Sequence, residues 1–174
     1  MRRARWAALL TYTAGMFLSL PYTRSLVTWS EARLGSGALL AAAGALFGLA
    51  GALLVGRLLR TRETFPWPHL ALAALVLGTW GAWRLLASSP IGRIHLPEYA
   101  LLAVLASRAF GDGTQATLGG CAAAAGVGLL DEYVQGATPG RVFDWWDVAL
   151  NAAASLLGAL TWAWWRWTGR GRLL

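Results

Sequence analysis

Long apolar stretches separated by short polar segments dominate this chain of 174 residues. Six stretches can be drawn along it: Trp6–Leu20, Gly37–Val55, Pro68–Leu86, Pro97–Phe110, Gln115–Tyr133 and Trp146–Trp165. A helix needs about 20 apolar residues to cross the hydrocarbon core of a membrane. The second, third, fifth and sixth stretches fit this length, the first needs some flanking residues, and the fourth is short.

The pattern therefore predicts an all-α fold, a polytopic membrane bundle of about six transmembrane helices. Strict alternation of apolar and polar residues, the mark of a membrane β-barrel, is absent. The fourth stretch carries Glu98, so an alternative is five full spans plus one short or re-entrant helix. No linker or low-complexity segment divides residues 1–174, and we expect a single membrane domain.

Composition supports a membrane setting. Hydrophobic residues make up 57% of the chain and charged residues only 13%, against about 25% charged in a typical soluble domain. The net charge of +7 comes from arginines placed at the ends of the apolar stretches. This placement favours the anionic membrane surface as a partner and argues against nucleic acid. Cys121 is the only cysteine and lies in an Ala/Gly-rich run, which suits a packing role.

The arginines also predict an orientation. In a six-span arrangement one side holds ten of them: Arg2, Arg3, Arg5, Arg57, Arg60, Arg62, Arg108, Arg166, Arg170 and Arg172. The other side holds five: Arg24, Arg33, Arg84, Arg93 and Arg141. By the positive-inside rule we expect a multi-pass protein of the cell membrane with both termini in the cytoplasm. The first stretch lacks a small-residue cleavage pattern at its end, so it is expected to remain as a helix.

Polar side chains gather at the predicted outer ends of the last three stretches. They are His95, Glu98 and Tyr99, then Asp131, Glu132 and Gln135, then Arg141 in a turn, and finally Asp144, Asp147 and Asn151. Within each group the spacing of three, four or seven residues places the side chains on one helix face. Acidic groups in lipid are costly and normally face the bundle interior, where they mark function. We expect these side chains to line one pocket open to the outer face.

Some of these residues also have structural interpretations. Asp144 could cap the sixth helix, with Asp147 as a favourable acid in its first turn. Asp131 could be a solvated interfacial charge, and we expect Glu132 to be the inward-facing acid of that pair. Arg141 is predicted to contact a carboxylate of the set, because a guanidinium can hold a desolvated carboxylate with two hydrogen bonds.

The set suggests acid–base chemistry, although the sequence leaves open whether the protein is an enzyme. Glu132 or Asp147 could act as general base, His95 as acid–base partner, and Arg141 could hold an anionic head group. A divalent cation among Glu132, Asp144 and Asp147 is a further option, with Mg²⁺ or Ca²⁺ suiting oxygen ligands. No Ser or Cys nucleophile with an adjacent base is evident, which argues against covalent acyl transfer.

The same residues resemble the signature of the VanZ-like family of integral membrane proteins. The matching pattern consists of His95, Glu98 and Tyr99, Glu132-x-x-Gln135, Pro139-Gly140-Arg141, Asp144, Asp147 and Asn151. It covers roughly residues 90–160, and the helical pair at about 37–86 looks like an insertion. One member of this family is associated with reduced sensitivity to teicoplanin, a glycopeptide that binds cell-wall precursors. The resemblance implies a role in the cell envelope. It does not imply a mechanism, because the family has no settled one.

Three functions are compatible with these features. The first is an enzyme or binder acting on an envelope lipid or a lipid-linked cell-wall intermediate at the outer leaflet. The second is a small proton-coupled transporter that uses the carboxylates as a relay. The third is a scaffold in which the polar set only joins helix ends by hydrogen bonds.

Overall fold

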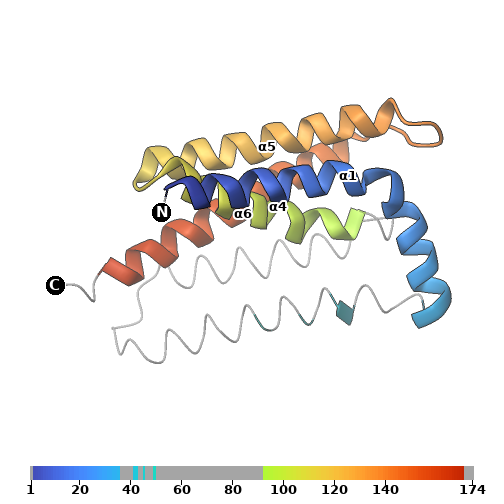
Figure 1. The fold of residues 1–174 in the computed structure, drawn as a ribbon, viewed down its shortest axis with the longest axis horizontal. Coiled ribbons are helices and arrows are strands. Elements are labelled where there is room, and N and C mark those ends of the chain that lie inside the picture. The colour runs from blue at the N-terminus through green and yellow to red at the C-terminus, as the bar shows by residue number, and fades with distance from the viewer. Residues whose placement is uncertain (1, 36–40, 43–44, 46–48, 50–91, 171–174) are drawn as a thin grey trace. The chain divides into compact units, whose positions relative to one another are not determined.

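A computed structural model of the chain describes residues 2–35, 41–42, 45, 49 and 92–170 (Figure 1). These residues form helices and no strand, as the all-α prediction requires. The bounded helices are α1 (Arg2–Leu34), α4 (Gly92–Phe110), α5 (Thr114–Gly136) and α6 (Trp145–Arg170). The predicted spans Gly37–Val55 and Pro68–Leu86 lie largely outside the described residues.

The chain divides into two compact units. Unit 1 contains residues 1–21 and 95–174, and unit 2 contains residues 22–94. Every residue of the predicted polar set, from His95 to Asn151, belongs to unit 1. The helical pair expected at 37–86 belongs to unit 2.

The first helix is longer than the apolar stretch Trp6–Leu20 that predicts it. Helix α1 continues through Pro21 to Leu34 and ends where Gly35, with φ of 89°, donates its backbone N–H to the Glu31 carbonyl at 3.0 Å. A glycine in the left-handed region is a common helix terminator. The helix thus includes flanking residues, as the short first stretch requires, because helical hydrogen bonding continues beyond the apolar sequence.

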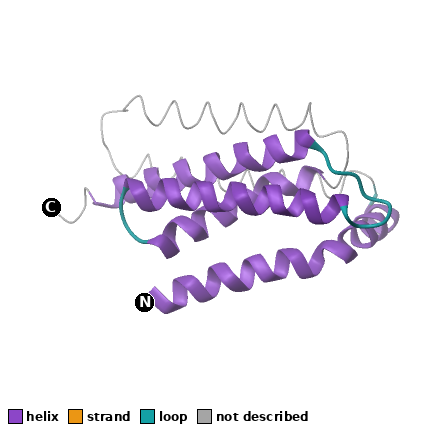
Figure 2. Ribbon diagram, turned by 90° about the horizontal axis from the view of Figure 1, so that it is seen from above, coloured by secondary structure: helices purple, strands orange, loops and turns teal. Residues whose placement is uncertain are grey.

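Within unit 1 the helices alternate in direction, and their connections lie at opposite ends (Figure 2). The Arg5 side chain of α1 donates to the Arg108 carbonyl of α4 at 3.3 Å, and Tyr12 donates to the Glu98 carbonyl at 3.1 Å. Arg166 of α6 donates to the Gly113 carbonyl, at the start of α5. One end of unit 1 therefore carries Arg5, Arg108 and Arg166, and we call it the arginine end.

Helices α4, α5 and α6 approach one another at three glycines. A methyl group at Gly120 of α5 would overlap the backbone of Ser107, and one at Gly158 of α6 would overlap the Ala100 carbonyl, both residues of α4. A methyl at Gly128 would lie 2.7 Å from the Cβ of Asn151 on α6. Small residues at such crossings let helix backbones touch, which is the usual packing of helices in membranes.

The interior of unit 1 is small and partly polar, whereas its outside is apolar. The buried face of α4 consists of residues at helical spacing: Leu96, Tyr99, Ala103, Ala106 and Ala109. Buried polar side chains accompany them: His95, Ser107, Thr117, Asp131, Glu132, Gln135, Asn151 and Ser155. Large hydrophobic side chains of the same helices are exposed, among them Leu10, Leu18, Leu118, Leu130 and Leu156. Extensive exposed apolar surface of this kind marks contact with a membrane or a partner.

Among the described residues, one helix segment, Trp145–Arg166, is long and apolar enough to cross a membrane, with a mean hydropathy of 1.2. Helix α4 carries Arg93, Glu98 and Arg108, and α5 is rich in Ala and Gly, which lowers hydropathy without shortening the helix. With 19 residues α4 is the shortest of the bounded helices, as the short fourth stretch suggests.

The glycine contacts predict a position-specific effect on stability. Gly158→Ala should lower the free energy of unfolding by about 1–3 kcal/mol, because the new methyl meets the Ala100 backbone and the helices must separate. Gly126→Ala is the matched control, since open space surrounds that position, and it should raise stability by up to about 1 kcal/mol. Unfolding of the two variants in mixed micelles, followed by tryptophan fluorescence, measures the difference. Equal stabilities would contradict the close approach of α4 and α6.

Candidate functional site

The predicted polar residues meet at the end of unit 1 opposite the arginine end. The N-terminal turns of α4 and α6 and the last turns of α5 lie together there, because α5 runs antiparallel to both other helices. Helix α4 begins at Gly92, five residues before the predicted start at Pro97. This early start makes His95 helical and places it one turn from Tyr99. The two rings stack with centroids 5.8 Å apart.

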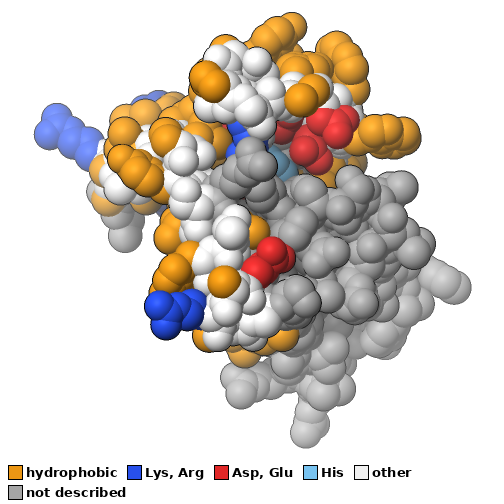
Figure 3. Space-filling view, turned by 90° about the vertical axis from the view of Figure 1, so that its right-hand side faces the viewer, with side chains coloured by type: hydrophobic (Ala, Val, Ile, Leu, Met, Phe, Trp, Pro, Cys, Tyr) orange, Lys and Arg blue, Asp and Glu red, His pale blue; other side chains and the backbone are white. Residues whose placement is uncertain are grey.

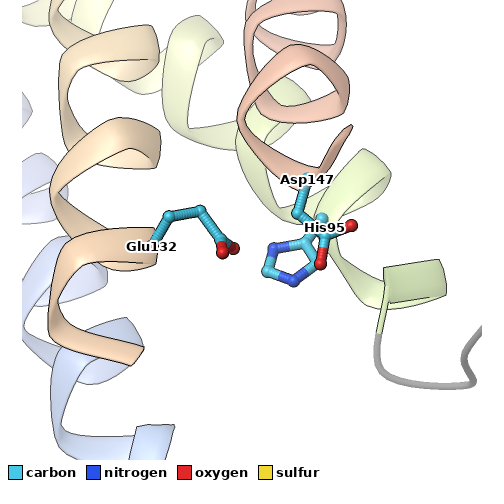
Figure 4. A group of neighbouring side chains, drawn as sticks. All are labelled: His95, Glu132 and Asp147. Carbon is cyan, nitrogen blue, oxygen red and sulfur yellow. The ribbon is translucent and has the colours of Figure 1, made fainter. Parts of the chain in front are cut away.

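Three of these side chains form a compact cluster, with one residue from each helix. His95 comes from α4, Glu132 from α5 and Asp147 from α6, and their side chains converge (Figure 4). One potential ligand atom from each residue lies within 4.8 Å of the other two. The exposed fractions of His95 and Glu132 are only 4% and 1%, and Asp147 is half-buried.

The cluster differs from the cation site expected at Glu132, Asp144 and Asp147, since His95 takes the place of Asp144. Asp144 is exposed, and its Oδ1 accepts the backbone N–H of Trp146 at 2.8 Å. This is the N-cap arrangement of a helix start. The capping interpretation therefore holds for Asp144, whereas Asp147 turns toward His95 and Glu132 and is more than a first-turn acid.

Several polar atoms of the cluster have no hydrogen-bond partner within the part of the chain that the structure describes. They are both ring nitrogens of His95 and the Oε1 atom of Glu132. The other oxygen of Glu132, Oε2, accepts the backbone N–H of Asp144 at 3.2 Å. Buried polar atoms are nearly always satisfied in folded proteins, so unpaired atoms that point at one another call for a ligand or water.

Asp131 lies at the centre of a hydrogen-bond network, contrary to the expectation of a solvated interfacial charge. It is 5% exposed, and its Oδ2 atom accepts the Tyr99 hydroxyl and the Gln135 Nε2, each at 2.8 Å. The same oxygen is 3.9 Å from Nδ1 of His95. Both acids of the Asp131–Glu132 pair face inward, because adjacent residues of one helix can contact two different partner segments: α4 for Asp131 and the start of α6 for Glu132. The spacing of Asp131 to Gln135, one turn, was the sequence signal for this network.

Arg141 does not form the predicted ion pair with Glu132, Asp144 or Asp147. Its guanidinium instead donates to the side-chain oxygen of Gln135, and within the described residues no carboxylate lies at ion-pair distance from it. The turn explains the geometry. Thr138 accepts the Arg141 backbone N–H at 3.1 Å across Pro139 and Gly140, whose φ is 78°, as in a type II turn. Arg141 is thus linked to Asp131 through Gln135.

Asn151 lies one level deeper in the bundle, on the same α5–α6 interface as Glu132. Its Nδ2 donates to the Gly128 carbonyl at 3.3 Å, and its backbone carbonyl accepts the Ser155 hydroxyl. The structure therefore brings Asn151 and Glu132 to the same side of the bundle. Glu98 contacts α1, because its backbone carbonyl accepts the Tyr12 hydroxyl. Nothing in the first apolar stretch predicts this contact of Tyr12.

Electrostatics at the site favour a neutral histidine. Burial lowers the pKa of His95, the nearby carboxylates of Asp147 and Asp131 raise it, and Arg141 lowers it, with a net shift downward. A neutral imidazole keeps one nitrogen lone pair free to accept a proton or a metal ion. Figure 3 shows acidic side chains gathered beside the histidine on this face.

Comparisons with known proteins give no further assignment, since no family model, curated protein or solved structure matches the chain.

The Asp131 network predicts a selective effect of removing one hydroxyl. Tyr99→Phe should lower the free energy of unfolding by about 1–3 kcal/mol, because a buried carboxylate loses one of its two hydrogen-bond donors. Tyr133→Phe, the same change at an exposed position of α5, is the control and should leave stability within about 0.5 kcal/mol. Chemical unfolding in detergent provides the comparison. A silent Tyr99→Phe variant would mean that Asp131 does not depend on this hydroxyl.

Proposed function

We propose that the chain is a VanZ-like integral membrane protein whose polar site binds or acts on a cell-envelope lipid or lipid-linked intermediate at the outer leaflet. The observation that carries the proposal is the convergence of His95, Glu132 and Asp147 at one end of a bundle with an apolar exterior. Such a group of buried titratable residues at a helix-bundle end is the default candidate for a functional site. A link to teicoplanin resistance follows from the family resemblance.

The distribution of polarity in unit 1 supports the membrane part of the proposal. Exposed leucines cover the outside of the same helices whose inner faces carry Asp131, Gln135 and Asn151. A water-soluble bundle would place these groups the other way round. In lipid, the apolar exterior faces the hydrocarbon chains and the polar interior is sheltered.

The two ends of unit 1 support the orientation. Arg5, Arg108 and Arg166 lie at one end, and the acidic cluster lies at the other. Lys and Arg are retained on the cytoplasmic side of a membrane protein. The proposed orientation therefore directs the acidic cluster outward, where envelope lipids and cell-wall intermediates are exposed.

The chemistry of the site suits an anionic head group held through a cation. The acids alone would repel a phosphate, and Arg141 provides only one positive charge through its turn position. A divalent cation bound by the cluster would reverse the local sign and attract phosphate oxygens. Without a bound cation, Glu132 or Asp147 would be the group able to accept a proton from a water or hydroxyl.

A scaffold role is the competing function, and the inter-helix hydrogen bonds of the site favour it. The hydrogen bond from Tyr99 to Asp131 joins α4 to α5, and the one from Asn151 to the Gly128 carbonyl joins α6 to α5. A scaffold needs these bonds but has no use for the unpaired atoms of His95 and Glu132. The proton-coupled transporter has less support, since carriers usually place their site near the midplane and the cluster lies at one end.

Labelling of single cysteines tests the orientation. In a Cys121→Ala background, Ala137→Cys at the site end and Gln115→Cys at the arginine end are both exposed positions, at opposite ends of α5. A membrane-impermeant maleimide should label residue 137 in intact cells and residue 115 only after permeabilisation. The reverse pattern would place the site in the cytoplasm, and labelling of both positions in intact cells would exclude a spanning α5.

Lipid analysis of three strains tests the function itself. A deletion strain should show an altered pool of envelope lipids or lipid-linked cell-wall intermediates, and the wild-type gene should restore it. Glu132→Gln, which keeps the shape and removes the charge, should fail to restore it at equal protein abundance. Asp112→Asn is the control, since this exposed acid lies at the arginine end beside Arg166 and should restore the pool fully.

Teicoplanin susceptibility of the same strains provides a second readout. If Glu132→Gln restored the lipid pool fully, the scaffold role would be favoured, because the Glu132 carboxylate would then be dispensable for the activity. An unchanged lipid pool in the deletion strain would reject the proposed substrate class.

A further inference from the structure

We infer that His95, Glu132 and Asp147 together bind one d-block cation of the Zn²⁺ class, an ion that takes nitrogen as well as oxygen ligands. One coordination position of the ion would be left open toward the outer face. The inference deepens the proposed function by naming the ion, and its use for a phosphate head group rests on that function. Binding of the ion itself depends only on the three side chains.

The donor set selects the class of metal. Mg²⁺ and Ca²⁺ are hard ions that take oxygen ligands almost exclusively, and the site expected from sequence, with three carboxylates, would have suited them. The structure replaces one carboxylate with the imidazole of His95. Imidazole together with two carboxylates suits Zn²⁺ and neighbouring d-block ions.

The distances require only a small adjustment of side chains. Zn²⁺ bonds of about 2.0–2.2 Å to nitrogen and oxygen place neighbouring ligand atoms roughly 3.4 Å apart in a tetrahedron. In the protein the three potential ligand atoms already lie within 4.8 Å of one another. Rotation of the half-buried Asp147 side chain toward the other two would close the remaining gap.

The unpaired atoms point to a ligand independently of the acidic cluster. His95 and Glu132 are each more than nine-tenths buried, and His95 offers two ring nitrogens and Glu132 one oxygen without a partner among the described residues. An unsatisfied buried polar group costs about 1–3 kcal/mol. A cation coordinated by these atoms would satisfy one nitrogen and the oxygen in a single step.

Neighbouring groups hold the potential ligands in place, as the hydrogen-bond partners of metal ligands do. The Asp144 backbone N–H binds Glu132 Oε2, which leaves Oε1 directed at the cluster. Asp131, fixed by Tyr99 and Gln135, lies 3.9 Å from Nδ1 of His95 and adds negative charge beside the ring. Outer partners of this kind orient metal ligands, and their loss commonly lowers metal affinity by about 10–100-fold.

Three protein ligands leave at least one position of the ion for another molecule. Closed structural zinc sites use four protein ligands, whereas sites that bind substrate or water use three. The ion would thus present a Lewis-acidic position at the face where Arg141 also lies. A phosphate oxygen or a water molecule is the ligand that such a position accepts.

Direct metal binding tests the inference. The full chain, purified in detergent with an affinity tag that contains no histidine, is stripped with a chelator and titrated with ZnCl₂ alone. Elemental analysis after desalting should give one Zn²⁺ per chain, and calorimetry should show a single site. Mg²⁺ and Ca²⁺ at the same concentration should not bind. Glu132→Gln and Asp147→Asn should each weaken Zn²⁺ binding at least 100-fold, and Asp131→Asn should weaken it about 10–100-fold.

Matched controls separate the site from adventitious binding. His69→Gln removes the other histidine of the chain, and Asp112→Asn removes an acid at the arginine end. Both variants should bind Zn²⁺ as the wild type does. Thermal unfolding of every variant without metal establishes that it is folded. If Glu132→Gln unfolds, Asp147→Asn carries the test, since Asp147 is less buried.

The inference is overturned if Zn²⁺ does not bind, if the site variants bind it unchanged, or if Mg²⁺ binds equally well. The proposed function can be judged apart from these outcomes. A missing Zn²⁺ site together with a lipid change in the Glu132→Gln strain would reject the metal alone. Stoichiometric Zn²⁺ with a normal lipid pool in the deletion strain would reject the lipid function alone.

Discussion

The burial of Asp131, Glu132 and Asp147 between three helix ends is the constraint on which the rest of unit 1 depends. A carboxylate removed from water needs hydrogen-bond donors or counter-charges in fixed positions. Two of the acids have such donors on another helix or in the α5–α6 turn: Tyr99 of α4 donates to Asp131, and the Asp144 backbone donates to Glu132. The early start of α4 and the tight turn before α6 place these donors beside the acids.

Packing and polarity in unit 1 are therefore two aspects of one arrangement. Glycines at positions 120, 128 and 158 bring the helix backbones together along the length of the bundle. This close approach lets the short side chain of Asn151 reach the Gly128 carbonyl, and it places three side chains from three helices within reach of a common point. A larger residue at Gly128 would collide with the side chains of Asn151 and Tyr99 and so disturb the polar groups beside them.

Within the described residues the sequence predicted helices, and it named the residues that meet at the site end, because apolar length and helical spacing are local properties. Tyr99 follows from its spacing to His95, Gln135 from its spacing to Glu132, and Asn151 from its spacing to Asp147, each three or four residues within one helix. Contacts between helices were harder to predict. In the cluster His95 stands where Asp144 was expected, and Arg141 binds Gln135 instead of a carboxylate. Both outcomes depend on how the helices are rotated about their axes. Small residues such as Gly120 and Gly158 set that rotation, and their partners are far away in sequence.

The glycine contacts also limit how α4 can move against α5 and α6. Where backbones touch at Gly120 and Gly158, sliding or parting of α4 from α5 and α6 would break contacts between main chains, which have no alternative rotamers to accommodate the motion. If the chain acts on a lipid as proposed, an acyl chain would not enter between these helices at the levels of Gly120 and Gly158. The head group would then reach the site over the end of the bundle, past the short turn with Pro139 and Gly140. A lipid would have to present its head group to the site from the membrane surface while its tail stays outside the bundle.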